Sequence, residues 1–242
     1  MKTDGLDELR LLLLQKRFDI RRPIQEETLL PGFMDMHVHL SSPPGQVFFL
    51  EARLLSVPRK TVNADAIKFC ATGGVFSRGT RVGQIQYSLE EMQAVVSEGH
   101  YRDLVVAAHA HGTAGIKAGI LAGVDSVEHA SMLDEEAIQL AKEHGTYLSM
   151  DIYNTEYTLS RGRENGVPEE NLKKGEKVDR VQRESFSAAM KAGVKRVFGT
   201  DAAIYPHGYN ARQFSRMVKF GMIETQALER GNDKCGNPYE MR

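Results

Sequence analysis

The sequence has few of the residues that mark secreted or membrane proteins. It contains two cysteines in 242 residues, too few for the disulfide framework that stabilises small secreted domains. We therefore expect a reducing compartment, the cytoplasm. No apolar run approaches the roughly 18 residues that a membrane-spanning helix needs, so the sequence predicts no membrane partner.

The sequence also lacks an excess of charge of either sign. Its 31 basic and 32 acidic residues give a formal net charge of -1, so a nucleic-acid partner is not expected. The hydrophobic share of 41% is ordinary for a globular domain with one core. We expect an N-terminal segment (residues 1–30), a main domain (residues 31–222) and a disordered C-terminal tail (residues 223–242), because the tail has little periodicity.

From residue 31 onward, short runs of β-forming residues alternate with helical patterns, which is typical of a parallel α/β sheet. The candidate strands are GFMDMHVHL, DAIKFCATGG, LVVAAHAHG, VDSVEHA, TYLSMDIY and VKRVFGTDAA. The helical patterns are SLEEMQAVVSEGH, which opens with a capping box from Ser88 to Glu91, DEEAIQLAKEHG, which stops at Gly145, and RVQRESFSAAMKAG. Residues 155–177 are polar and contain glycine, which predicts a long flap over a functional site.

Two histidines close the first candidate strand. His37 and His39 are separated by one residue, so on a strand both imidazoles point to one face, about 7 Å apart, and can reach one metal ion. A pair of core histidines satisfied by hydrogen bonds is an equally good reading of this motif alone. The other strands also end in metal-binding or titratable residues, namely Lys68, His109, His111, His129 and Asp201. Because strand ends open on one face of a β/α barrel, we expect these groups to converge.

Lys68 and Asp201 each allow two interpretations. Lys68 follows apolar residues, and it is either a lysine whose ammonium reaches solvent or a functional lysine. A functional lysine here has a lowered pKa or is converted by CO2 into an anionic carbamate that bridges two cations. Asp201 precedes a Pro/Gly turn, and it either caps the following segment or acts as a metal-site carboxylate and general base for a water.

Several blocks of the sequence carry a family resemblance. They are TLLPGFMDMHVHL, AIKFCATGGVFSRG, VAAHAHGTAGIKAGILAGVDSVEHAS and LSMDIYNTEY, the last followed by VFGTDAAIYPHG. Together they resemble the amidohydrolase superfamily, and closely its Xaa-Pro dipeptidase (prolidase-type) and imidazolonepropionase-like branch. The blocks cover most of residues 28–222, and their shared order and position at strand ends make the resemblance specific.

The resemblance implies a distorted (β/α)8 barrel of the TIM type with a binuclear zinc site, in which manganese or cobalt could replace zinc. The implied metal ligands are His37, His39, Lys68 as a carbamate formed with CO2, His109, His129 and Asp201. His111 is implied to face the substrate, and Tyr153 to hydrogen-bond the developing oxyanion. The loop after Asp201 adds Tyr205 and His207 as candidate substrate contacts.

The implied reaction is hydrolysis of an amide bond in a small peptide or an N-acyl amino acid. A hydroxide that bridges two metal ions is the expected nucleophile, and Asp201 carries the proton to the leaving nitrogen. A small molecule or dipeptide is therefore the expected partner. Two other readings stay open, a cyclic-amide hydrolase of the imidazolonepropionase type and a catalytically impaired remnant that only binds metal.

The first two ligand-bearing strands lie too close in sequence for a complete barrel. Only 28 residues separate His39 from Lys68, whereas the intervening βα units need on the order of 90 residues at about 30 per unit. We therefore expect an incomplete barrel of about six strands, without closure, and residues 1–30 as a remnant or replacement of the family's β-sandwich domain. An internally deleted gene product, a barrel completed by a second copy in a homo-oligomer, and a reduced open barrel all fit this spacing.

Overall fold

The computed structural model divides the chain into two units, residues 1–33 and residues 34–242. It describes Asp35, His37 and residues 66–232, all of which belong to the second unit. His39 and the expected N-terminal segment lie outside the described residues. So does the short connection that precedes the strand of Lys68.

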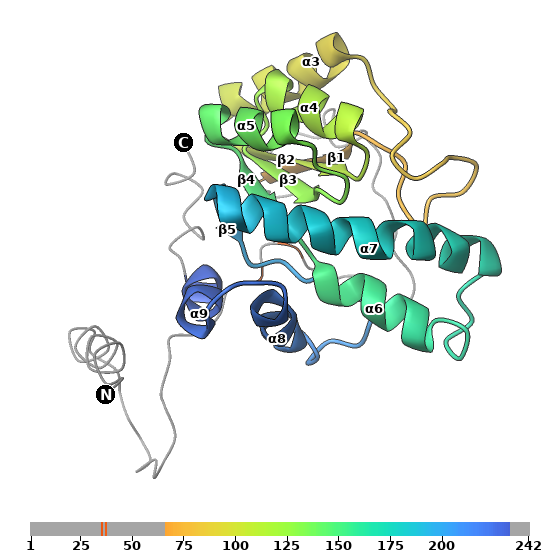
Figure 1. The fold of residues 1–242 in the computed structure, drawn as a ribbon. Helices are drawn as coiled ribbons and strands as arrows, with labels where there is room; N and C mark the ends of the chain where they lie inside the picture. Colours follow the sequence, from red (N-terminus) through yellow and green to blue (C-terminus); the bar gives the residue numbers. More distant parts are fainter. Residues whose placement is uncertain (1–34, 36, 38–65, 233–242) are drawn as a thin grey trace, which may run out of the picture. The chain divides into compact units, whose positions relative to one another are not determined.

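Five parallel strands form one sheet, paired in the order in which they occur along the chain (Figure 1). Their bounds are Ala66–Cys70 (β1), Val105–Ala110 (β2), Ser126–His129 (β3), Tyr147–Ser149 (β4) and Arg196–Val197 (β5). Five of the six candidate strands are thereby confirmed, and the candidate at residues 31–40 is described only at Asp35 and His37. The five described strands make an open sheet, as an incomplete barrel requires.

The described helices follow the strands and cover the sheet. They are α3 (Leu89–Tyr101), α4 (Thr113–Ala122), α5 (Glu135–His144), α6 (Ile152–Arg161), α7 (Glu169–Ala192), α8 (Arg212–Lys219) and α9 (Glu224–Asn232). In Figure 1, α3, α4 and α5 lie side by side along the sheet, and α4 packs against both of its neighbours. α6 packs against α7 and α8, and α8 packs against α9. No helix in the part of the chain that the structure describes is long and apolar enough to cross a membrane.

Local sequence explains where these helices begin and end. The capping box expected at α3 is confirmed, since Ser88 Oγ accepts from the Glu91 N–H and the Glu91 carboxylate accepts from the Ser88 N–H. At α5, the Asp134 side chain accepts from the Ala137 N–H. The same helix ends at Gly145, whose φ of 69° is a left-handed conformation that favours glycine.

The flap expected over residues 155–177 is wrong. Most of that segment is helical, in α6 and the first part of α7, and only residues 162–168 connect them. Its charged residues lie on the outer side of the pair, while Leu172 and Val178 are buried. Gly175 allows the close approach of the two helices, because a Cβ there would lie 3.3 Å from Leu159 Cδ2.

The tail expected after residue 222 is also partly wrong. Residues 224–232 form α9, which packs against α8. Ala227 is 1% exposed and joins the core, as does Met222. With so few buried apolar residues, the segment shows little hydrophobic periodicity in the sequence. Packing against the core, rather than helix propensity, stabilises this helix.

Strand alternation divides β2 between two environments. Val106, Ala108 and Ala110 are fully buried and belong to the apolar core, together with Ile116 and Ile120 of α4. His109 has the opposite parity and therefore points to the other face of the sheet. One row of β2 thus builds the core under the helices, and the other row is available for a site.

Replacement of Gly115 on α4 by alanine should destabilise the protein by about 1–3 kcal/mol, because overpacking forces neighbours apart. A Cβ at Gly115 would lie 2.1 Å from Thr72 Cγ2. Gly119 on the same helix is the matched control, since a Cβ there meets only ordinary contacts of 3.6 and 3.8 Å. Gly119→Ala should stabilise by up to about 1 kcal/mol through helix propensity. Urea unfolding compares the two, and equal effects would contradict this packing.

Candidate metal centre

Register places the candidate ligands at one edge of the sheet. Cys70 pairs with His109, and His109 pairs with Glu128, so the C-terminal ends of β1, β2 and β3 lie level with one another. His129 pairs with Ala110, which belongs to the core-facing row. A left-handed backbone at His129 (φ 69°) breaks the strand alternation there, and its imidazole reaches the same cavity as that of His109.

Asp35 joins the first candidate strand to the segment after β5. Its carboxylate accepts hydrogen bonds from the N–H of His37 at 3.2 Å and from the N–H of Thr200 at 3.0 Å. It also accepts from Thr200 Oγ1 and from Asn210 Nδ2. The backbone continues this attachment, because the N–H groups of Thr200 and Asp201 donate to the His37 carbonyl. His37 therefore lies directly beside Asp201.

Two carboxylates face the buried imidazole of His37. Glu128 Oε2 lies 3.0 Å from Nδ1, and Asp201 Oδ1 lies 3.2 Å from Nε2. Lys68 Nζ is 2.6 Å from the same Nε2. Burial and Lys68 lower the pKa of His37, but Asp201 and Glu128 raise it more, so the net pKa rises to about 9. Burial also opposes ionisation of Glu128, but the charges of His37 and Lys68 outweigh it and lower its pKa to about 2.

A chain of buried hydrogen bonds links His129 to Asp201. His129 Nδ1 lies 2.8 Å from Asp151 Oδ1, and Asn154 Nδ2 donates both to Asp151 Oδ2 at 2.9 Å and to Asp201 Oδ2 at 2.7 Å. Gln182 of α7 also donates to Asp151. The network orients an imidazole and a carboxylate that come from different strands, as outer partners do around metal sites.

Four imidazoles crowd the same edge. The ring centroids of His109 lie 4.8 Å from His111 and 4.5 Å from His129, and His111 stacks on His129 at 4.6 Å. Burial, and then the neighbouring histidines, hold the pKa values of His109 and His111 well below the ordinary value. These two imidazoles are therefore neutral, the form that binds a metal ion or shares a hydrogen bond.

The cluster surrounds a cavity of about 50 Å³. Of the predicted site residues, those on its wall are His37, Lys68, His109, His111, His129 and Asp201. Gly74 leaves this space open, because a Cβ there would lie 2.8 Å from His109 Nε2. Lys68 itself is an exposed residue on the cavity wall, and it is not enclosed by the apolar residues beside it in the sequence. Those neighbours, Ile67 and Phe69, have the opposite strand parity.

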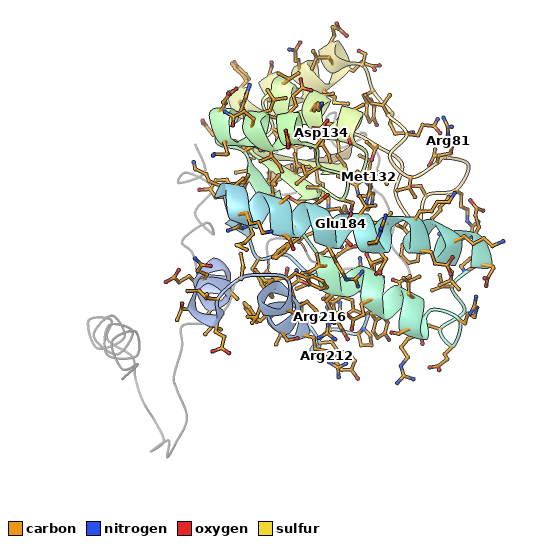
Figure 2. All side chains as sticks on the ribbon, viewed as in Figure 1. Arg81, Met132, Asp134, Glu184, Arg212 and Arg216 are labelled. Carbon is orange, nitrogen blue, oxygen red and sulfur yellow. The ribbon has the colours of Figure 1, made fainter. Side chains whose placement is uncertain are left out.

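Three predicted residues in the described part of the chain, Tyr153, Tyr205 and His207, do not line this cavity. Tyr153 and Tyr205 pack against each other in a T-shaped pair at 5.1 Å, and neither lines the cavity wall. The Tyr153 hydroxyl accepts from Arg212, which Figure 2 shows on α8 near Arg216. Tyr205 is fully buried, and His207 is exposed in the following loop. The substrate contacts expected of these three residues stay predictions.

Sequence reasoning missed the partners that orient the predicted groups. They are Asp35, Glu128, Ser131, Asp151 and Asn154. Glu128 immediately precedes His129, and Asp151 and Asn154 lie on either side of Tyr153 in the sequence. Closeness in sequence to a predicted site residue was therefore the one feature that could have marked them. An acidic or serine residue alone carries no such signal, because these types are common on any surface.

Comparisons with known proteins identify the family of the chain. The profile of the Amidohydrolase family matches residues 50–240 of the chain. The chain belongs to the amidohydrolase family. A curated relative, ochratoxinase from Aspergillus niger, is 37% identical over 168 residues, which are 69% of this chain and 34% of the relative.

Solved structures show the same fold. A Xaa-Pro dipeptidase with bound methionine matches with a TM-score of 0.69 and 35% identity, over 76% of this chain and 45% of that one. The crystal structure of A. niger ochratoxinase matches with a TM-score of 0.64 and 34% identity, over 72% and 39%. The chain thus spans about a third to a half of the length of these relatives. The open five-stranded sheet is part of an amidohydrolase TIM barrel.

The donor set fits divalent metal ions. Two overlapping groups have ligand atoms within 4.8 Å of one another, His109 with His111 and His129, and His37 with His129 and Asp201. In His37 and His129, Nδ1 faces a carboxylate, as in carboxylate–histidine–zinc arrangements, where Nε2 is the nitrogen that binds the metal. Nitrogen and carboxylate ligands in this mixture suit zinc.

The metal-free protein should lose stability as the pH rises from about 6.5 to about 9. The folded state binds the His37 proton more tightly, with a pKa of about 9 against 6.5 for the unfolded chain. The ion-pair contribution is therefore fully present below pH 6.5 and is lost as the pH rises through 9. It is on the order of 3 kcal/mol, and urea unfolding between pH 6 and 9.5 measures it.

Glu128→Gln should reduce this decline, because it removes one of the two carboxylates that hold the proton. Glu143→Gln, at an exposed glutamate of α5, is the matched control and should keep the wild-type slope. The same slope in Glu128→Gln would show that the ion pair with His37 does not control the proton.

Proposed function

We propose that this chain is a metal-dependent amide hydrolase acting on a small peptide or an N-acyl amino acid. One observation carries the proposal, the convergence of His37, Lys68, His109, His129 and Asp201 on one cavity from segments far apart in sequence. Groups that the sequence predicts as ligands and that also meet in space are a strong mark of a catalytic site. The similarity to Xaa-Pro dipeptidase and ochratoxinase supports the same class of reaction.

Two divalent ions, preferably zinc and alternatively manganese or cobalt, fit the proposed site. His37, His129 and Asp201 would hold one ion, and His109 would serve the other. Lys68, as a carbamate, would supply oxygen ligands to both, and its exposed position beside His37 leaves it accessible to CO2. A further proposed ligand, His39, lies outside the described residues. Such ions lower the pKa of water and polarise a carbonyl oxygen.

The chain's own residues would position the substrate and move the proton. Asp201 is the proposed general base, and Asn154 restrains it by donating to Oδ2. The backbone of Asp201 is left-handed (φ 55°), a strained conformation that is frequent at functional sites. His111 is the proposed contact to a substrate oxygen, since it lines the cavity and Ser131 holds its other nitrogen.

The competing proposal is a protein that binds metal without turnover. It is motivated by the open sheet of the described residues and by the partial span of the relatives. A second copy of the chain that completes the barrel is a variant of the first proposal. A cyclic-amide substrate remains an alternative within the same chemistry. These alternatives differ in zinc content, in the cleavage of amide substrates and in the mass of the protein in solution.

The full chain purified with zinc and bicarbonate should carry close to two zinc equivalents and cleave an amide substrate. The substrates to compare are Xaa-Pro dipeptides, N-acetyl amino acids, ochratoxin and a cyclic amide. Asp201→Asn should lower kcat/KM by on the order of 10² or more, the usual contribution of a general base. Lys68→Ala should lower both the metal content and the rate. Elemental analysis, amine release and the mass in solution are measured on the same samples.

Matched controls separate these effects from general damage. Asp103→Asn makes the same chemical change at an exposed aspartate with a similar left-handed backbone (φ 58°), and Lys142→Ala removes an exposed lysine of α5. Both should retain activity. Bound zinc without cleavage of any substrate would favour the metal-binding remnant, and less than one equivalent of zinc would refute the metal site.

A further inference from the structure

His111 and His129 present stacked imidazoles to the cavity, but different chemical groups hold them. The ring centroids are 4.6 Å apart, with an angle of 16° between the planes. Nδ1 of His129 lies 2.8 Å from a carboxylate oxygen of Asp151, and Nδ1 of His111 lies 2.8 Å from Ser131 Oγ. A carboxylate only accepts hydrogen bonds, whereas a hydroxyl can donate one.

The carboxylate determines the tautomer of His129. A neutral imidazole carries its hydrogen on one nitrogen and a lone pair on the other. Asp151 requires a donor, so the hydrogen of His129 lies on Nδ1. Its Nε2 then offers a lone pair to the cavity, which is the form that binds a metal ion.

The hydroxyl imposes the opposite tautomer on His111. Ser131 is fully buried, and among the described residues His111 Nδ1 is the one acceptor within hydrogen-bond distance of its hydroxyl. If Nδ1 carried the hydrogen, the Ser131 O–H would be a buried donor without an acceptor, which costs a full desolvation penalty. If Ser131 donates instead, its hydroxyl hydrogen bonds to the lone pair of His111 Nδ1. The hydrogen of the neutral ring then lies on Nε2, which faces the cavity.

We propose that Ser131 is a positioning residue that holds His111 in the Nε2–H tautomer. In that form, His111 donates a hydrogen bond to a carbonyl or carboxylate oxygen of the substrate and does not bind metal. The inference rests on the proposed function for the identity of the acceptor. The tautomer itself is a property of the protein alone.

The surrounding backbone holds Ser131 in this place. Ser185 of α7 donates through Oγ to the Ser131 carbonyl at 2.9 Å and accepts from the N–H of Leu133 at 3.0 Å. Met132, labelled in Figure 2 beside α7, donates its N–H to the His111 carbonyl at 2.9 Å. The Ser131 loop and the His111 loop are thus tied together by main-chain and side-chain bonds, so the pair of Ser131 and His111 has a defined geometry.

The other ring nitrogen of His111 faces open space. A Cβ built on Gly74 would lie 3.6 Å from His111 Nε2, and glycine supplies no such atom. A substrate oxygen can therefore approach Nε2 from the side of residues 74–76, which line the same cavity. The stacked position on His129 brings this donor close to the proposed metal ligands without making it one of them.

The tautomer is measurable by long-range 1H–15N NMR of the full chain labelled at its eight histidines, with His111→Gln as the assignment variant. We expect a protonated Nε2 and an unprotonated Nδ1 for His111, and the reverse for His129. After zinc is added, the Nε2–H of His111 should persist. A protonated Nδ1 in His111, or loss of its Nε2–H on zinc binding, would overturn the proposal whether or not the protein hydrolyses any substrate.

Variants test the role of the hydroxyl. Ser131→Ala should give His111 a mixture of tautomers and leave His129 unchanged, whereas Ser131→Thr, which keeps the hydroxyl, should restore the wild-type spectrum. Ser187→Ala removes a serine hydroxyl that donates to the Phe220 carbonyl, and it should change neither histidine. An unaltered His111 tautomer in Ser131→Ala would show that Ser131 does not set it. If Ser131→Ala does not fold, the wild-type and Ser131→Thr spectra still decide the tautomer.

If a substrate is found, Ser131→Ala should lower kcat/KM by about tenfold, the worth of one hydrogen bond, at unchanged zinc content. A change mainly in KM identifies a substrate carboxylate as the acceptor, and a change mainly in kcat identifies the scissile carbonyl. An unchanged kcat/KM would refute the donated hydrogen bond.

Discussion

Parallel pairing of the five strands is the constraint on which the rest of the structure depends. Because the ladder aligns Cys70, His109 and Glu128 at one level, every loop that follows a strand begins at the same edge of the sheet. The helices that return the chain are then obliged to cover the opposite row of side chains. Core and site are built from alternate residues of the same strands, which is why β2 can be both the centre of the core and a source of imidazoles.

Charge compensation is the second requirement at this edge. Imidazoles and carboxylates are gathered with little access to water, and each must find a partner of opposite character. Glu128 meets His37, Asp151 meets His129, and Asn154 bridges two carboxylates that would otherwise repel each other. The partners are as much a part of the site as the groups that they hold, because without them the buried charges would be expelled or neutralised.

The elements with a clear local signal could be predicted from sequence. Short β-rich runs with titratable ends gave five strands, and Ser88 and Gly145 marked helix ends that the structure contains. α6 and the start of α7 could not be recognised, because Gly175 and a charged outer face imitate a loop. His109 and His129 were found because their type is rare and informative. Glu128 and Ser131 were not, since their roles depend on partners that only the folded chain brings within reach.

The clamp made by Asp35 has a consequence for the order in which the molecule forms. It joins residue 35 to residues 200 and 210, so the chain must close a very long loop before these bonds exist. Such contacts form late and slowly, because the entropy of closure is lost before any contact compensates for it. During synthesis, His37 cannot contact Thr200 and Asp201 until all five described strands have been made. The site is therefore completed late in folding, and a chain that ended before Thr200 would lack both the bonds that hold Asp35 and His37 and the Asp201 carboxylate.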